Sequence, residues 1–188
     1  MAKAKGTTLI GAVRHLRKNK AQAREVLPPE LHHYLEERIT ESRWYPESDL
    51  HLLLKAMLEM IPGDRDEILA RLGAVSAREH LDGIYSHLKG GRSDGVARRA
   101  VALWSSQHDT GRFEITTLSA NEMIMTVRDF GHPSEVMCGI LGGYLAETLR
   151  IDGASDVKIQ KTKCVLRGDD VCSWRRMWHR NEGTGHKH

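Results

Sequence analysis

The C-terminal half of the chain alternates apolar and polar residues in two separate stretches. Residues 111–130 read GRFEITTLSANEMIMTVRDF and alternate on both sides of Ser-Ala-Asn, which predicts a β-hairpin. Residues 155–178 alternate again on both sides of Arg-Gly-Asp-Asp and predict a second hairpin. Between the hairpins, residues 133–153 predict a helix, with Pro133 in its first turn and Gly153 just beyond its end.

The N-terminal half follows a helical period instead. Apolar residues recur at helical spacing in residues 14–27, 28–42, 44–60, 62–73, 76–91 and 93–108. Gly73 is expected to end one of these helices, and Gly90-Gly91 the next. A short apolar run near the start, residues 7–13 (TTLIGAV), contains β-branched residues and predicts an edge strand.

This order of elements predicts an α+β domain with a four-stranded antiparallel sheet, in the order helices, hairpin, helix, hairpin. No internal repeat or linker divides the chain. We therefore expect a basic N-terminal segment with the edge strand (residues 1–24), one domain (residues 25–180) and a disordered tail (residues 181–188).

Composition places the chain among soluble globular proteins. It has 188 residues, of which 40% are hydrophobic and 28% charged, and its longest apolar run is too short to span a bilayer. Three cysteines without a secretory signal favour a reducing, cytoplasmic location over a disulfide framework. The net charge of +3 and the 5% aromatic content do not indicate a nucleic-acid partner, although the residues before Glu25 are basic.

All three cysteines lie in the C-terminal third of the chain. Cys164 and Cys172 flank the Arg-Gly-Asp-Asp turn, and Cys138 lies early in the preceding helix. The three thiols converge if that helix packs on the sheet, and Gly142-Gly143 would allow a close approach. Converging thiolates can hold zinc, but free cysteines are more often small buried hydrophobic residues, and the spacing leaves both interpretations open.

A set of residues around these cysteines resembles the signature of the 4-vinyl reductase domain. The residues that carry the resemblance are Glu135, Cys138, the Gly-Gly-Tyr ending at Tyr144, Cys164, the turn of residues 167–170, Cys172 and Trp174. The family belongs to a wider group that contains the TRAPP vesicle-tether subunits of the Bet type and the haem nitric-oxide-binding domains. The upstream sequence WYPESDLHLLLKAM is similar to the single-domain myxobacterial branch of that group.

The resemblance implies a helical N-terminal layer packed on a twisted antiparallel sheet, and a sensor role. In phenol-sensing members of the family, the domain binds a small hydrophobic molecule, and three cysteines and an acid hold a structural zinc. The three cysteines correspond to Cys138, Cys164 and Cys172 of this chain. The resemblance therefore implies zinc as a structural cofactor.

The fourth zinc ligand departs from the family pattern. Lys161 stands at the position of the acid, and a protonated lysine cannot ligate a metal. Glu135, one helical turn before the first cysteine, is the substitute we expect if zinc is bound. Asp169, Asp170 and His179 are further candidates.

Six side chains are candidates for the wall of a ligand pocket: Trp44, Tyr45, Tyr85, His87, Trp104 and Phe113. Aromatic residues also build ordinary cores, and the sequence does not separate the two roles. Of the other histidines, His80 is expected to face solvent and His108 to lie in a loop beside Asp109.

Cofactors other than zinc are not expected. Haem nitric-oxide-binding domains need a proximal histidine and a Tyr-x-Ser-x-Arg clamp, whereas this chain has YSHLKGGR, in which Ser86 directly follows Tyr85. The spacing therefore predicts no haem. P-loop, dinucleotide and nucleophile motifs are absent too, which predicts no nucleotide and no enzymatic activity.

Together these features predict a non-catalytic small-molecule-binding or regulatory domain that signals through a protein partner. The expected ligand is a hydrophobic or aromatic molecule, and we expect a homodimer. Two alternatives remain. One is a dimeric interaction scaffold, which the similarity to tether subunits suggests. The other is an accessory factor in tetrapyrrole vinyl reduction, the activity for which the family is named.

Overall fold

The computed structural model describes residues 1–82 and 101–180. Its N-terminal part contains β1 (Lys3–Lys5), α1 (Gly6–Arg17), α2 (Lys20–Val26), the 3₁₀ helix η1 (Pro29–Leu35), β2 (Trp44–Pro46) and α3 (Glu47–Glu59). Its C-terminal part contains α4 (Arg65–Asp82), β3 (Arg112–Ser119), β4 (Glu122–Arg128), α6 (Glu135–Ile151), β5 (Ala154–Lys163), the 3₁₀ helix η3 (Val165–Arg167) and β6 (Cys172–Arg180). Residues 101–107 are also helical and precede β3.

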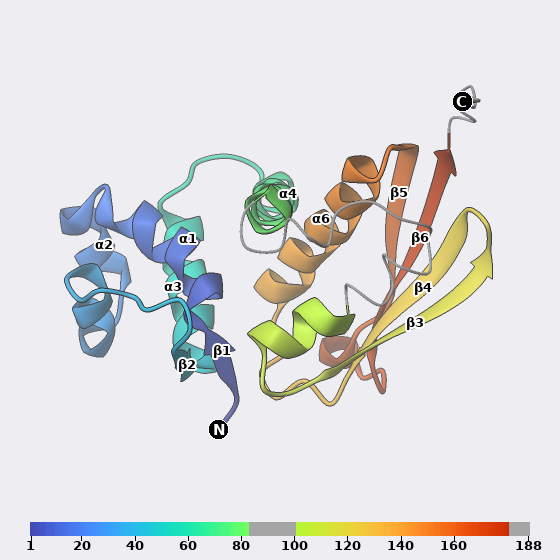
Figure 1. Cartoon of the computed structure of the whole chain (residues 1–188). Coiled ribbons are helices and arrows are strands. Elements are labelled where there is room, and N and C mark those ends of the chain that lie inside the picture. Colours follow the sequence, from blue (N-terminus) through green and yellow to red (C-terminus); the bar gives the residue numbers. More distant parts are fainter. Residues whose placement is uncertain (83–100, 181–188) are drawn as a thin grey trace.

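The elements form two layers, which Figure 1 shows side by side. The N-terminal layer consists of β1, α1, α2, η1, β2 and α3, and the C-terminal layer consists of α4, α6, residues 101–108 and the sheet. The sheet has the strand order β3-β4-β6-β5, and all neighbouring strands are antiparallel. The predicted α+β fold, with helices, hairpin, helix and hairpin in this order, is confirmed.

Alternation along the strands sets the buried face of the sheet. In β4, Met123, Met125 and Val127 are buried at every second position. The register places Met125 opposite Trp174 of β6, which is buried as well. Because successive side chains of a strand point to opposite faces, these residues form one apolar face. Leu145 of α6 belongs to the same core cluster, so α6 covers this face.

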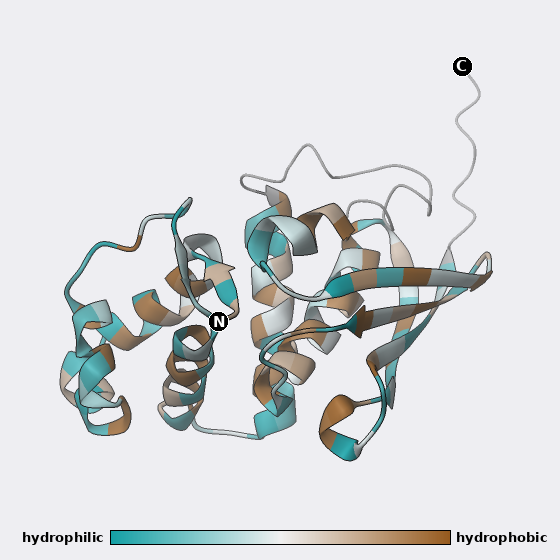
Figure 2. Cartoon of the chain, turned by 90° about the horizontal axis from the view of Figure 1, so that it is seen from below, coloured by the Kyte–Doolittle hydropathy of each residue, from teal (hydrophilic) through white to brown (hydrophobic). Residues whose placement is uncertain are grey.

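The segment 7–13 is helical, and the prediction of an edge strand there is wrong. α1 buries Leu9, Val13 and Leu16 in the N-terminal core, at helical spacing. The strand of this region, β1, comes before the helix and pairs with β2. The basic residues of the N-terminal segment therefore belong to packed elements of the N-terminal layer. Figure 2 shows hydrophobic residues on the helices of both layers.

α4 runs without a break through Gly73, where the sequence predicted a helix end. A Cβ at Gly73 would overlap the carbonyl oxygen of Ile140 in α6. On the facing helix, a Cβ at Gly143 would lie 2.7 Å from the Cα of Ala70. The two glycines thus let the backbones of α4 and α6 touch. Gly143 serves this contact between helices rather than the expected approach of α6 to the sheet.

The helices within the described ranges are all too short or too polar to cross a membrane.

Candidate functional site

A cavity of about 350 Å³ lies where the two layers meet. Its wall includes Thr8 and His15 from α1, Leu50, Leu54 and Met57 from α3, Ser76, Glu79 and His80 from α4, Trp104 and His108, Phe113 from β3, and Met137 and Tyr144 from α6. No single element forms the cavity, because each of these helices contributes one strip of side chains. Pockets of this size hold small organic molecules.

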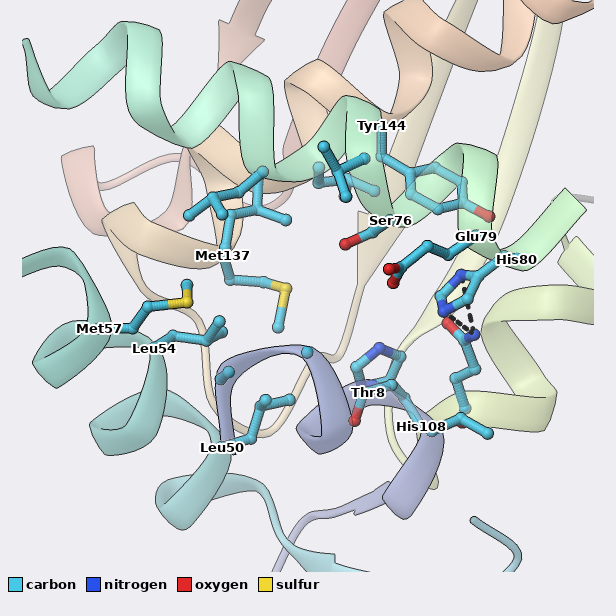
Figure 3. A pocket seen from close by; sticks show the side chains of 18 of the residues that line it. Thr8, Leu50, Leu54, Met57, Ser76, Glu79, His80, His108, Met137 and Tyr144 are labelled. Atoms are coloured by element: carbon cyan, nitrogen blue, oxygen red, sulfur yellow. Dashed lines mark hydrogen bonds between the residues drawn. The ribbon is translucent and has the colours of Figure 1, made fainter. Parts of the chain in front are cut away.

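The wall is apolar at one end and polar at the other (Figure 3). Leu54, Met57 and Met137 gather at the apolar end. Ser76 and His80 lie together at the opposite end. An apolar wall with a few convergent polar groups is the usual composition of a site that binds and orients a small molecule.

His80 is a polar residue of the cavity wall, not the solvent-exposed side chain that the sequence predicted. Its Nδ1 lies 3.3 Å from the amide nitrogen of Gln107. Burial lowers the pKa of His80 to about 4, because a charged imidazolium loses its hydration there. The imidazole is therefore neutral near pH 7 and can act as a hydrogen-bond partner or a metal ligand.

The depressed pKa of His80 predicts a pH-dependent stability. The unfolded chain takes up this proton near pH 6.5, whereas the folded chain does so only near pH 4. The unfolded state therefore binds more protons between these values, and stability falls as the pH falls through this window, by about 3 kcal/mol in total. Thermal unfolding measured from pH 4 to pH 8 should show this slope, and His80→Gln should flatten it.

The control for this experiment is His33→Gln, at an exposed histidine of η1. This change should leave the slope unaltered. If the His80→Gln protein keeps the full pH dependence of stability of the wild type, that dependence comes from other titrating groups.

His108 joins the two layers through a buried contact. Its Nδ1 lies 3.1 Å from Oε2 of Glu47, the first residue of α3, and both side chains are buried. The ring of His108 also stacks on Trp104, with 4.4 Å between the ring centroids. Asp109 instead accepts a hydrogen bond from the backbone N–H of Lys3. The partner of His108 is thus 61 positions away in the sequence and not its neighbour.

The six predicted pocket residues are only partly brought together. Trp104 and Phe113 line the cavity. Trp44 is exposed at the surface beneath the Lys5 ammonium, and Tyr45 is buried in the N-terminal core, so the prediction is wrong for both. Because adjacent residues of a strand point to opposite faces, Trp44 of β2 points to the surface and Tyr45 into the N-terminal core. The remaining two candidates, Tyr85 and His87, lie outside the described residues.

The three cysteines converge as the hairpin register predicted. The sulfur atoms of Cys138, Cys164 and Cys172 all lie within 4.8 Å of one another. The sulfurs of Cys138 and Cys172 are 3.9 Å apart and join α6 to β6. We call these three residues, together with Lys161, the thiol centre.

The predicted fourth ligand is not part of this group. Glu135 is exposed at the first position of α6, and the cluster of ligand atoms does not include it. Asp169 accepts a hydrogen bond of 2.7 Å from the backbone N–H of Cys164 and so stabilises the turn. Asp170 forms an ion pair with Lys163. The acids nearest to the cysteines are therefore exposed or engaged elsewhere.

Lys161 occupies the remaining side of the thiol centre. Its Nζ lies 3.8 Å from the sulfur of Cys172. Burial disfavours its charge, but hydrogen bonds to the sulfurs of Cys138 and Cys164 outweigh this effect and raise the pKa of Lys161. An ammonium group has three donors and no lone pair, so it cannot complete a tetrahedral zinc site. The residues present therefore do not fit zinc.

The thiols themselves respond differently to this environment. Burial raises the pKa of Cys138 to about 12. Burial also acts against ionisation of Cys164, but the hydrogen bond from Lys161 and one involving the backbone of Leu166 lower its pKa overall. Cys138 is thus held as a protonated thiol near pH 7, whereas the environment of Cys164 favours its thiolate more than water would.

A second, much smaller cavity of about 30 Å³ lies between the large cavity and the thiol centre. Cys138 and Cys172 line it on one side. Trp104, Met137 and Leu141 line both cavities. Trp104 of the helical segment 101–107 and two side chains of α6 therefore lie between the two cavities.

Sequence reasoning missed most of the cavity wall. Thr8, His15 and His80 lie on helices whose apolar residues already explain the burial pattern, so nothing in their spacing marks them. The glycines of α6 were a usable signal, because a glycine-rich helix predicts a close backbone contact. The contact partner, α4, could not be identified from the sequence.

Comparisons with known proteins found the fold but no family. No family model matches the sequence, and no curated protein matches it either. Among solved structures, it is similar to an oxygen-binding H-NOX domain related to soluble guanylate cyclases, with a TM-score of 0.65 and 11% identity over 96% of each chain. It is also similar to an unliganded Fe(II) H-NOX protein variant from K. algicida, with a TM-score of 0.66 and 13% identity over 95% of this chain and 98% of the other.

A third neighbour was solved to relate haem redox potential to porphyrin distortion, and has a TM-score of 0.64 and 12% identity over 92% of this chain and 99% of the other. These neighbours overturn the expectation that haem is excluded. The missing Tyr-x-Ser-x-Arg spacing concerns one way of holding the cofactor, whereas an iron ligand can come from any element that lines a cavity. The wider group that the sequence resembles includes the haem nitric-oxide-binding domains, and this chain has the fold of the H-NOX domains.

Proposed function

We propose that the chain is a non-catalytic sensor domain that binds a small, largely apolar molecule in the cavity between its two layers. The observation that carries the proposal is this cavity of about 350 Å³, with its apolar end and its convergent polar end. The absence of nucleophile and nucleotide motifs from the sequence supports binding rather than catalysis.

The position of the cavity suits a sensor. α1 and α3 form one side of the wall, and α4 and α6 form the other. A ligand therefore contacts both layers at once, and its binding changes the free energy of their contact. A ligand that interacts differently with two arrangements of the layers shifts the population between them. A protein partner that contacts both layers would respond to this change of population.

Haem is the ligand class that we infer for this cavity. The neutral imidazole of His80 is in the protonation state that binds iron. Arg14 and Lys18 of α1 also line the cavity and can pair with carboxylates, while its leucine and methionine side chains suit a macrocycle. When bound, a haem supplies an iron that can take up a diatomic gas.

The proposal is tested by titrating the purified chain with hemin and, separately, with phenol and larger aromatic compounds. We expect hemin to bind at about one equivalent with a shifted Soret band, and bound ligand to raise the melting temperature by mass action. His80→Ala should change the Soret spectrum of bound hemin. It should leave binding of neutral aromatic compounds nearly unaltered.

A blocking variant separates cavity binding from surface binding. Leu54→Trp places a larger side chain in the apolar end, and we expect it to weaken ligand binding by at least about tenfold. The matched control is Leu118→Trp, because Leu118 is 51% exposed on β3. Equal binding by both variants, or no binding of any compound by the folded wild-type chain, would contradict the proposal.

A further inference from the structure

We infer that Lys161 takes the place of a metal ion in the thiol centre, so that this chain carries a metal-free site of three thiols around one ammonium group. Three cysteine sulfurs within 4.8 Å of one another form three corners of a zinc site. The group beside these corners is an ammonium nitrogen, 3.8 Å from the sulfur of Cys172, instead of a carboxylate or an imidazole.

The position of Lys161 is fixed by the sheet. The register of β5 and β6 places Lys161 opposite Trp174. The Nζ lies 4.7 Å from the centroid of the Trp174 ring, which attracts the cation through its electron-rich face. The same Nζ lies 3.8 Å from the sulfur of Cys172. The ring and the sulfurs therefore hold the ammonium from two sides.

The chemistry of this arrangement matches the role of a metal. An ammonium group has three N–H donors, which equals the number of sulfurs in the thiol centre. Its positive charge stabilises negative charge on sulfur, as a bound cation would. The same charge repels a Zn²⁺ ion, and the side chain offers no lone pair for a fourth bond.

The candidate acids and the histidine do not complete the site in place of Lys161, and Glu135 is exposed and lies outside the cluster of ligand atoms. Asp169 is bonded to the backbone N–H of Cys164. Asp170 is paired with Lys163. His179 lies seven positions beyond Cys172 along β6, which is roughly 23 Å of extended strand. The exclusion of metal thus depends on one residue.

This inference predicts that a single substitution creates a metal site. Lys161→Glu supplies a carboxylate to the three thiolates, and we expect the variant to bind about one equivalent of Zn²⁺. The wild-type chain should retain less than about a tenth of an equivalent after the same treatment. The matched control is Lys158→Glu, which changes the charge equally at an exposed lysine of the same strand, away from the turn. It should behave as the wild type.

Each protein is expressed with added Zn²⁺, exchanged into metal-free buffer and measured by elemental analysis. Co²⁺ serves as a second probe, because its bonds to thiolates absorb in the near ultraviolet. Native labelling with a thiol reagent adds an independent readout. The cysteines of zinc-loaded Lys161→Glu should react more slowly than those of the wild type, and denaturant should restore the reaction.

Two results would overturn the inference. One is a wild-type chain with about one equivalent of Zn²⁺ and protected cysteines. The other is a folded Lys161→Glu protein that takes up neither Zn²⁺ nor Co²⁺. If Lys161→Glu does not fold, Lys161→His tests the same point, because three cysteines and one histidine form a common structural zinc site. Failure of a folded Lys161→His variant to bind either metal would equally overturn it.

Discussion

Replacing Gly143 with alanine should lower the free energy of unfolding by about 3 kcal/mol, because the added methyl group has no space. Its Cβ would lie 2.7 Å from the Cα of Ala70 and still closer to the Ala70 carbonyl oxygen. Both are backbone atoms, so no side chain can rotate away, and α4 and α6 must separate. The melting temperature should fall by about 6–12 °C, measured by thermal unfolding followed by circular dichroism.

The matched control is Gly11→Ala in α1, where nothing lies within 4 Å of the added Cβ. Alanine has the better helix propensity, so this variant should be more stable than the wild type by about 0.5–1 kcal/mol. The two substitutions are chemically identical and differ only in their surroundings. A Gly143→Ala protein as stable as Gly11→Ala would contradict the close contact of α4 and α6.

Replacing Glu47 with alanine should cost about 3 kcal/mol, because it leaves the imidazole of His108 buried without the carboxylate. Glu47 is 2% exposed and His108 7% exposed, so bulk water has little access to the lost hydrogen bond. Glu47 also stands at the N-terminus of α3, where a negative charge is favoured by the helix dipole. Chemical denaturation with urea measures the loss through the shift of the midpoint.

The control for Glu47 is Glu36→Ala, since Glu36 bonds Lys20 and Arg24 at the surface. Exposed ion pairs add little to stability, so its midpoint should stay close to that of the wild type. The double variant Glu47→Ala, His108→Ala completes the comparison. If the two single changes simply add, the side chains do not interact and the proposed link between the layers fails.

The sheet could be predicted because the sequence pattern that specifies each hairpin is local. Alternation in β3 and β4 on both sides of Ser119 to Asn121, and again in β5 and β6, fixes the buried face and the hairpins without reference to the rest of the chain. The same register predicted the meeting of Cys164 and Cys172. The strand order β3-β4-β6-β5, in which β4 and β6 join the two hairpins, needed the structure.

The errors in the N-terminal half have a common cause. A run of seven residues such as TTLIGAV fits both a strand and one face of a helix, and the partner that decides between them, the N-terminal core, is distant in sequence. Gly73 carries the usual signal of a helix end, but it is required by the backbone of α6. In both cases a tertiary contact, and not the local helix or strand propensity, determines the structure.

The candidate site was predictable only in part for the same reason. The thiol centre lies on one hairpin and the helix before it, so sequence spacing reveals it. The large cavity draws its wall from α1, α3, α4, α6, residues 103–108 and Phe113 of β3, and no spacing connects these elements. The pairing of Lys161 with the thiols needed the structure as well, because the sequence shows only that an acid is missing.

α6 takes part in both sites through adjacent residues. Met137 lines the large cavity, and Cys138, the next residue, belongs to the thiol centre. A shift of this helix along or about its axis would move both side chains together. If ligand binding and a change at the thiols favour different positions of α6, the two events are thermodynamically linked. Each would then alter the equilibrium constant of the other by the same factor, so that a covalent change at one cysteine would set the ligand concentration to which the cavity responds.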